Sequence, residues 1–213
     1  TGASSYSITI NNNGLAQSAG SGTANIISDD AWTNKTNGVV NVVYTITPFS
    51  GSCAGAAYTV TVPITPEPLG VSTTANVCSN TAFNYDLQVD NITGLGNGLA
   101  STFTWSAADN VNVTGEPVGA QATSTISSTL VNTTLINQVV VYTITPTSAG
   151  CAGDPFTISV TVRPEPVGST STEAAVCSDA VTGYVLAATG ASSYSITINN
   201  NGLAQSAGSG TAN

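Results

Sequence analysis

Cysteine has the most reactive side chain in this sequence, and it occurs four times, at Cys53, Cys78, Cys151 and Cys177. The gaps between these cysteines are 25, 73 and 26 positions, no pair is spaced Cys-x-x-Cys, and the chain has no histidine. Structural zinc sites use such pairs or mixed Cys and His ligands, so the spacing does not indicate a zinc site. It favours disulfide bonds, which are typical of proteins outside the cytoplasm.

Carboxylates are the other groups that could do chemistry, because serine and cysteine triads lack their base without histidine. Asp86 and Asp90 fall on one face of an expected strand, about 13 Å apart, which is wider than the separation in glycosidases. Asp29 and Asp30 are the one candidate for a Ca²⁺ site, but no third spaced acid follows, which favours an ordinary acidic loop. We therefore predict a protein that is not an enzyme and has no catalytic residue, cofactor or other metal site.

The composition excludes several classes of partner. Eleven acidic and two basic residues give a net charge of −9, so binding to nucleic acid by phosphate neutralisation is excluded. No run of 18 apolar residues exists that could span a membrane, and a hydrophobic fraction of 41% argues against a disordered spacer. Four Asn-x-Thr triplets, which we interpret as surface markers, begin at Asn34, Asn91, Asn112 and Asn132.

The sequence repeats on two scales. Residues 1–25 recur letter for letter as residues 189–213, which gives a period of 188 residues. Within that period the segment from Val43 to Pro48 returns 98 positions later, and so do a Cys-Ala-Gly and a Pro-Glu-Pro motif. Self-similarity at a fixed period is the signature of repeat architectures. The sequence therefore predicts a segment of a longer array in which two diverged modules alternate.

Apolar and polar residues alternate in four stretches of the middle module, which predicts strands at 83–89, 102–106, 140–144 and 156–163. No stretch shows a convincing helical spacing, and Pro146 is expected to end the third of these strands. About seven short strands in just under 100 residues, with Trp105 buried on the third, predict an immunoglobulin-like β-sandwich. Trp32 precedes a loop and could be exposed.

The predicted fold class is all-β, with immunoglobulin-like sandwiches stacked end to end in a rod. Residues 1–66 are expected to be the C-terminal part of one module, 67–164 a complete module, and 165–213 the N-terminal part of the next. The predicted linkers are Pro66-Glu67-Pro68 and Pro164-Glu165-Pro166. Their prolines fix the backbone dihedrals and make each connector short and stiff, while the glutamates keep the joint hydrated.

These motifs resemble the PKD-like and immunoglobulin-like repeats of very large surface proteins in Bacteroidota. The residues that carry the resemblance are the Val-Tyr-Thr-Ile-Thr-Pro strand, the Cys-Ala-Gly loop, the strand before Pro-Glu-Pro, and the Val-Cys-Ser that follows. The resemblance covers both modules and implies a secreted cell-surface protein that works in adhesion, gliding or filament formation. It brings no catalytic residue.

In such a sandwich Cys78 and Cys177 are expected at the distal end of a module, and Cys53 and Cys151 at the proximal end. The favoured pairing is a staple across each joint, which links Cys78 to the following module and Cys151 to the preceding one. Two other pairings stay open. One joins Cys53 with Cys78 and Cys151 with Cys177, and the other joins Cys78 with Cys151 inside one module.

The leading functional hypothesis is a non-catalytic structural repeat in the shaft of a long extracellular surface filament or adhesin. Its expected partners are neighbouring repeats of the same chain, with other filaments, surfaces or glycans contacted by regions elsewhere. A carbohydrate-binding accessory module of a secreted enzyme is the alternative, and a polymer of separate subunits joined by strand exchange is a third possibility.

Overall fold

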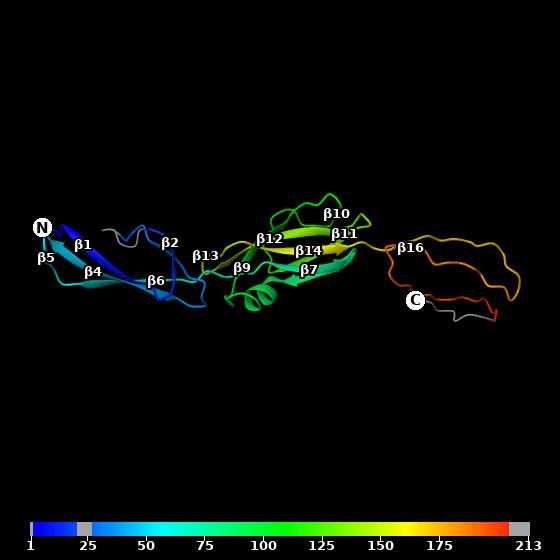
Figure 1. The fold of residues 1–213 in the computed structure, drawn as a ribbon, viewed down its shortest axis with the longest axis horizontal. Coiled ribbons are helices and arrows are strands. Elements are labelled where there is room, and N and C mark those ends of the chain that lie inside the picture. Colours follow the sequence, from blue (N-terminus) through cyan, green and yellow to red (C-terminus); the bar gives the residue numbers. More distant parts are fainter. Residues whose placement is uncertain (1, 21–26, 205–213) are drawn as a thin grey trace.

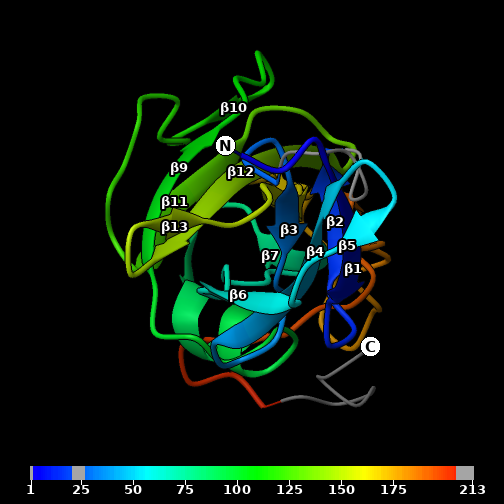
Figure 2. The same cartoon turned by 90° about the vertical axis from the view of Figure 1, so that its left-hand side faces the viewer.

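The computed structural model describes residues 2–20 and 27–204, and these form three parts in a row along one long axis (Figure 1). We call β1–β6 the first module, β7–β14 the second module and residues 165–204 the third segment. Figure 2 looks along the same axis from the N-terminal end, with the first module in front. The predicted all-β rod of stacked sandwich modules is confirmed. None of the described residues forms a helix long and apolar enough to cross a membrane.

The second module is a two-sheet sandwich. One sheet has the order β9–β12–β14–β7, with the short β13 also on β12, and the other has the order β10–β11–β8. All neighbours are antiparallel except β14 and β7, which run in parallel. The bounds are β7 (Thr73–Cys78), β8 (Thr81–Asp86), β9 (Thr102–Ala107), β10 (Val113–Thr114), β11 (Thr125–Asn132), β12 (Gln138–Ser148), β13 (Cys151–Ala152) and β14 (Phe156–Arg163).

Alternating side chains from both sheets meet in one core. Trp105 is 5% exposed and contacts the ring of Tyr142 edge-on at 5.9 Å between centroids, which confirms its predicted place in the core. Its indole N–H donates to the carbonyl of Thr123 at 2.9 Å. The strands predicted at 102–106, 140–144 and 156–163 are all present as β9, β12 and β14, although β12 continues through Pro146 to Ser148.

The prediction of a strand through residues 87–89 was wrong, as was the expectation that no helix forms. The chain leaves β8 at Asp86 and enters a single π-helical stretch, η1 (Leu87–Thr93). The carboxylate of Asp86 accepts from the amides of Gln88 and Val89, both at 3.0 Å, and so caps this stretch. Asp90 turns back and accepts from the amide of Asp86 at 3.0 Å, so the two acids do not share a strand face.

The first module has a four-stranded sheet in which β1, β6 and the short β5 all pair with β4, and β2 and β3 form a separate pair. The bounds are β1 (Ser5–Asn11), β2 (Ala16–Ala19), β3 (Ala31–Thr33), β4 (Val40–Ser50), β5 (Cys53–Ala54) and β6 (Tyr58–Ile64). Strands β1, β4 and β6 of this module are the equivalents of β9, β12 and β14.

The third segment follows Arg163 at the other end of the rod (Figure 1). It contains one pair of two-residue strands, β15 (Val167–Gly168) and β16 (Ala188–Thr189). The other described residues of this segment form no strand, and most of them are exposed.

Candidate functional site: the joint between the two modules

The linker between the modules is packed into the protein. Pro66 and Pro68 are both buried, and the amide of Glu67 donates to the carbonyl of Asn34 at 2.9 Å. Two glycines of the second module let the linker lie close to it. A methyl group on Gly153 would overlap the carbonyl oxygen of Pro68, and one on Gly96 would overlap that of Leu69. The linker is therefore held by packing on both modules as well as by proline stiffness.

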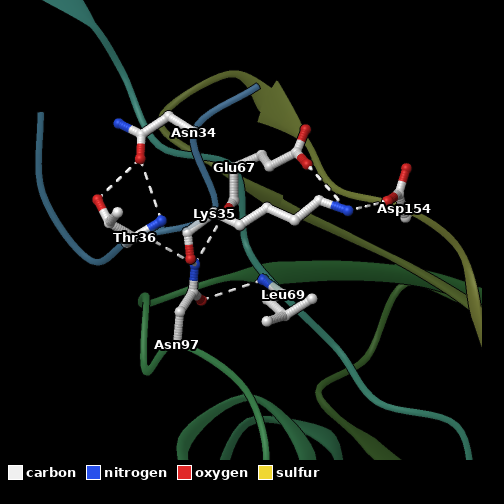
Figure 3. A network of polar contacts seen from close by, with 7 residues as sticks. All are labelled: Asn34, Lys35, Thr36, Glu67, Leu69, Asn97 and Asp154. Carbon is white, nitrogen blue, oxygen red and sulfur yellow. Dashed lines mark hydrogen bonds and ion pairs between the residues drawn. The ribbon is translucent and has the colours of Figure 1, made fainter. Parts of the chain in front are cut away.

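Asn97 is the centre of a polar network at this joint (Figure 3). Its side-chain amide donates to the carbonyls of Glu67 at 2.8 Å, Thr36 at 3.0 Å and Lys35 at 3.2 Å. Its side-chain oxygen accepts from the amide of Leu69 at 3.0 Å. One side chain from the loop after η1 thus connects the first module, the linker and the second module.

An ion pair crosses the same joint. The ammonium of Lys35 lies 2.6 Å from a carboxylate oxygen of Asp154 in the second module and 3.8 Å from one of Glu67 in the linker. The hydrogen bond with Asp154 raises the pKa of Lys35 above its ordinary value. Because the side chain of Asp154 is 71% exposed, the ion pair contributes about 0.2–1 kcal/mol to docking of the two modules. It therefore sets their relative orientation more than it stabilises the joint.

The loop that presents Lys35 is held from inside by Asn34. The amide of Asn34 donates to the carbonyls of Gly38 and Ile64 at 2.9 and 2.8 Å, and its oxygen accepts from the amide and hydroxyl of Thr36. Asn132 and Thr134 repeat these contacts in the second module. The interpretation of the Asn-x-Thr triplets as surface markers was wrong for Asn34, Asn91 and Asn132, which are all buried.

The junction that follows the second module has different residues at the positions of the ion pair. In the 98-residue register, Thr133 takes the place of Lys35, and Ala56 takes the place of Asp154. Glu165 and Pro166 are exposed there, whereas Glu67 is half-buried and Pro68 is buried in the first linker. The charged pair therefore belongs to the joint between the first and second modules. The equivalent positions of the other kind of joint hold uncharged residues.

The four cysteines are present as free thiols. Cys78 is opposite Arg163 at one end of the parallel β7–β14 pair, whereas Cys151 is opposite Ser148 in the hairpin that precedes β14. The length of β14 separates them by about 25 Å, far more than the roughly 7 Å that a disulfide tolerates between Cα atoms. Strand β7 ends, at Cys78, on the side of the third segment, and β13, which begins at Cys151, lies on the side of the first module (Figure 1).

The Asp29 and Asp30 pair lies beside the hydrogen-bonded side chains of Trp32 and Tyr44. Gln17 donates to the carboxylate of Asp30 at 2.9 Å, and the indole N–H of half-buried Trp32 donates to the hydroxyl of Tyr44 at 2.7 Å. Burial is the main reason that the pKa of Tyr44 is raised, and the Asp30 carboxylate adds to the effect. No group of three or more potential metal ligands occurs in the described ranges 2–20 and 27–204.

Sequence reasoning missed the residues that make the joint. Asn97 and Asp154 are far along the chain from Lys35, and no local motif marks them. The Asn34 loop did carry a signal, because Asn-x-Thr returns at Asn132 in the 98-residue register. A polar motif that repeats together with the strands is more consistent with a structural role than with chance.

The fold and the joint define a class of tandem β-sandwich modules, and the family comparison agrees. A family model described as "PKD-like domain" matches residues 1–68 and again residues 75–166. The chain therefore belongs to the PKD-like domain family and contains two matches to it. Domains of this kind are typical of extracellular repeat and adhesion modules.

No curated protein matches the chain. Among solved structures, the mouse clustered protocadherin PcdhgC3 EC1-3 is similar at 9% identity and a TM-score of 0.26, over 76% of this chain and 56% of that one. The human Desmocollin-1 ectodomain is similar at 11% identity and a TM-score of 0.30, over 83% of this chain and 37% of that one. The chain thus spans about half of the first protein and about a third of the second.

Proposed function

We propose that this chain is a length of the non-catalytic repeat shaft of an extracellular surface filament or adhesin, of the kind found in giant Bacteroidota surface proteins. The observation that carries the proposal is the packed joint. Asn97, the Lys35–Asp154 pair and the close approach of Gly153 to the linker hold two modules in one line. A chain that needed its modules only as separate binding units would have no use for this arrangement.

The shaft works by transmitting tension along the rod. Both modules have their long strands along the rod axis (Figure 1), so a pull on the ends shears the backbone hydrogen bonds of the sheets together. In the first linker, the buried prolines limit bending between modules. The domain limits 1–66, 67–164 and 165–213 belong to this proposal, with the joints centred on the Pro-Glu-Pro linkers.

Disulfide staples across the joints are part of the proposal. Cys78 is at the end of the second module that faces the next repeat, where the copy of Cys53 would be presented by the counterpart of the β4–β5 hairpin. Cys151 faces the preceding repeat in the same way, where the copy of Cys177 would lie. Each joint would then carry one disulfide, which would limit extension in an oxidising environment.

A carbohydrate-binding role is the second candidate, and Tyr6 and Tyr58 are the observation that favours it. Both tyrosines are partly exposed on one face of the first module, as a sugar platform would require. Their equivalents in the second module, Phe103 and Phe156, are core residues. We therefore interpret these tyrosines as core positions of a complete module rather than as a sugar platform, and we prefer the shaft.

The shaft proposal is tested on intact, non-permeabilised cells with antibodies raised against the second module. The expected result is labelling at regular intervals along filaments outside the cell, together with a very large band on reducing, denaturing electrophoresis. Labelling that requires permeabilisation would overturn the proposal. A band near 21.2 kDa would overturn the continuous shaft.

A further inference from the structure

The two kinds of module differ in length at one place. Cys78 is followed by Phe103 25 positions later, and Cys177 is followed by Tyr194 17 positions later. Tyr194 is the counterpart of Phe103, because the identical segment at residues 1–25 places the same tyrosine on β1, the equivalent of β9. The second module therefore has eight residues more in this stretch than the other kind of module.

The extra residues belong to the segment that contains η1. Up to Leu87 the two sequences keep the same spacing, because Tyr and Leu follow the cysteine after seven and nine positions in both. The difference therefore lies in residues 88–102, whose counterpart in the other kind of module is the shorter segment 187–193. We call residues 88–102 the long connection and residues 187–193 the short connection.

The long connection holds the chain that enters the second module. The side chain of Asn91 is fully buried, accepts from the amide of Val71 at 2.8 Å and donates to its carbonyl at 2.6 Å. Asn97 accepts from the amide of Leu69 (Figure 3), and Gly96 lies directly against the carbonyl of Leu69 because it has no side chain. The linker is therefore fixed on its own module by residues of the long connection.

The long connection also reaches the module before it. The side-chain amide of Asn97 donates to the carbonyls of Thr36 and Lys35 in the first module. The ammonium of Lys35 in turn pairs with Asp154 of the second module. These contacts fix the direction of the first module relative to the second, which holding the linker alone would not do.

The short connection holds its linker differently. Ala188 and Thr189 pair with Gly168 and Val167 as the two-residue strands β16 and β15. The letters of the short connection are Ala-Ala-Thr-Gly-Ala-Ser-Ser, with no Asn or Gln among them. It therefore has no side-chain amide that could donate to the carbonyls of the preceding module as Asn97 does.

The residues on both sides of that joint differ in the same sense. Thr133 takes the place of Lys35, and its amide and hydroxyl both donate to the carbonyl of Asn112 in its own module, at 2.9 and 3.0 Å. Ala56 takes the place of Asp154. Neither the donated amide bonds nor the ion pair of the first joint can therefore form there.

We propose that the joints of the array are of two kinds, a clamped joint before each module with the long connection and a hinge before each module with the short connection. The inference rests on the proposed shaft, in which the two kinds of module alternate. The shaft then consists of rigid two-module rods that bend relative to one another once per 188 residues. Bending at the hinges lets the filament change direction while each clamped pair stays in line.

The test on the full-length protein is electron microscopy of its native filaments, with the angle between successive modules measured along each contour. The expected result is that bends occur at every second joint, so that straight segments have the length of two modules. Filaments that bend equally at every joint, or at none, overturn this inference and leave the shaft in place. An absence of filaments outside the cell overturns both.

Exchanging the connection tests the clamp in the 213-residue chain. Replacing residues 88–102 by residues 187–193 gives the second module the short connection. In ¹⁵N NMR relaxation the two modules should then tumble separately, with the ratio of docked to undocked joints lowered at least about tenfold, because several hydrogen bonds across the joint are lost. If this variant keeps a folded second module and still tumbles as one rigid body, the inference is overturned.

Gly96→Ala tests the clamp without removing the connection, and it decides the case in which the exchange unfolds the second module. The added methyl group would overlap the carbonyl oxygen of Leu69 and should lower the ratio of docked to undocked joints about fivefold or more. Leu95→Ala, at the neighbouring residue that is 52% exposed, is the control and should leave the ratio unchanged. Equal tumbling of the two variants overturns the inference.

Discussion

Replacing Asn97 by alanine should uncouple the two modules without unfolding either. The side chain makes four hydrogen bonds across the joint, three of them donated by one amide group that has only two hydrogens. We therefore count the loss as three effective bonds of about 1 kcal/mol each. Lys35 and Thr36 are exposed, so water replaces part of the lost hydrogen bonding. The net loss of docking free energy between the modules is therefore about 2 kcal/mol.

A loss of about 2 kcal/mol lowers the ratio of docked to undocked joints roughly thirtyfold. The assay is ¹⁵N NMR relaxation of the 213-residue chain, since two docked modules tumble as one elongated body. In Asn97→Ala the two modules should tumble with separate and shorter correlation times. Small-angle scattering should show a broader distribution of lengths.

Two further variants control this experiment. Asn97→Asp keeps the acceptor for the amide of Leu69 but loses the donated bonds, and should uncouple the modules at least as much. Asn84→Ala removes an exposed hydrogen bond to Ser127 inside the second module and should change nothing at the joint. If Asn97→Ala still tumbles as one rigid rod, the joint does not depend on this network and the reasoning fails.

Three other substitutions test the joint and its supporting loops. Gly153→Ala should displace the linker through overlap with Pro68 and shorten the rod in small-angle scattering. The control Gly119→Ala, with open space around the glycine, should leave the scattering profile unchanged. Equal profiles for the two variants would contradict the close approach of Gly153 to the linker. Asn132→Ala leaves the carbonyls of Ile136 and Val162 without their buried donor. It should lower the free energy of unfolding of the second module by about 2–4 kcal/mol in denaturant titration. A loss below about 0.5 kcal/mol would contradict the role of Asn132 in holding its loop. Lys35→Thr should weaken docking of the two modules by no more than about 1 kcal/mol. It should also remove the salt dependence of docking in the relaxation assay. Because the pKa of Lys35 is raised above 10.5, its contribution is present at neutral pH and lost as the pH rises through that raised value, and the variant should lack this alkaline loss.

Strand positions in the second module could be predicted because each strand has one face in the core and one in solvent. Trp105 and its alternating neighbours record that division directly in the sequence. The prediction failed at Leu87, where the apolar spacing continues but the capping carboxylate of Asp86 starts η1. A local hydrogen bond decided there between two backbone forms that the side-chain pattern does not distinguish.

The joint was not predictable in its details. The Pro-Glu-Pro motifs mark where the modules meet, since proline limits the backbone whatever surrounds it. The partners of the linker come from distant parts of the chain, and Lys35 and Asp154 are 119 positions apart. No pattern of composition or spacing connects such residues, because their proximity exists only once both modules have folded and stacked.

The sequence by itself determined the repeat, the all-β class and the approximate positions of β8, β9, β12 and β14, because these depend on local periodicity and proline. Only the tertiary structure decided which residues meet at the joint. Asn97 donates to the carbonyls of Lys35, Thr36 and Glu67, which are 62, 61 and 30 positions away along the chain. A polar side chain removed from water needs hydrogen-bond partners, but the folded and stacked modules determine which distant groups supply them.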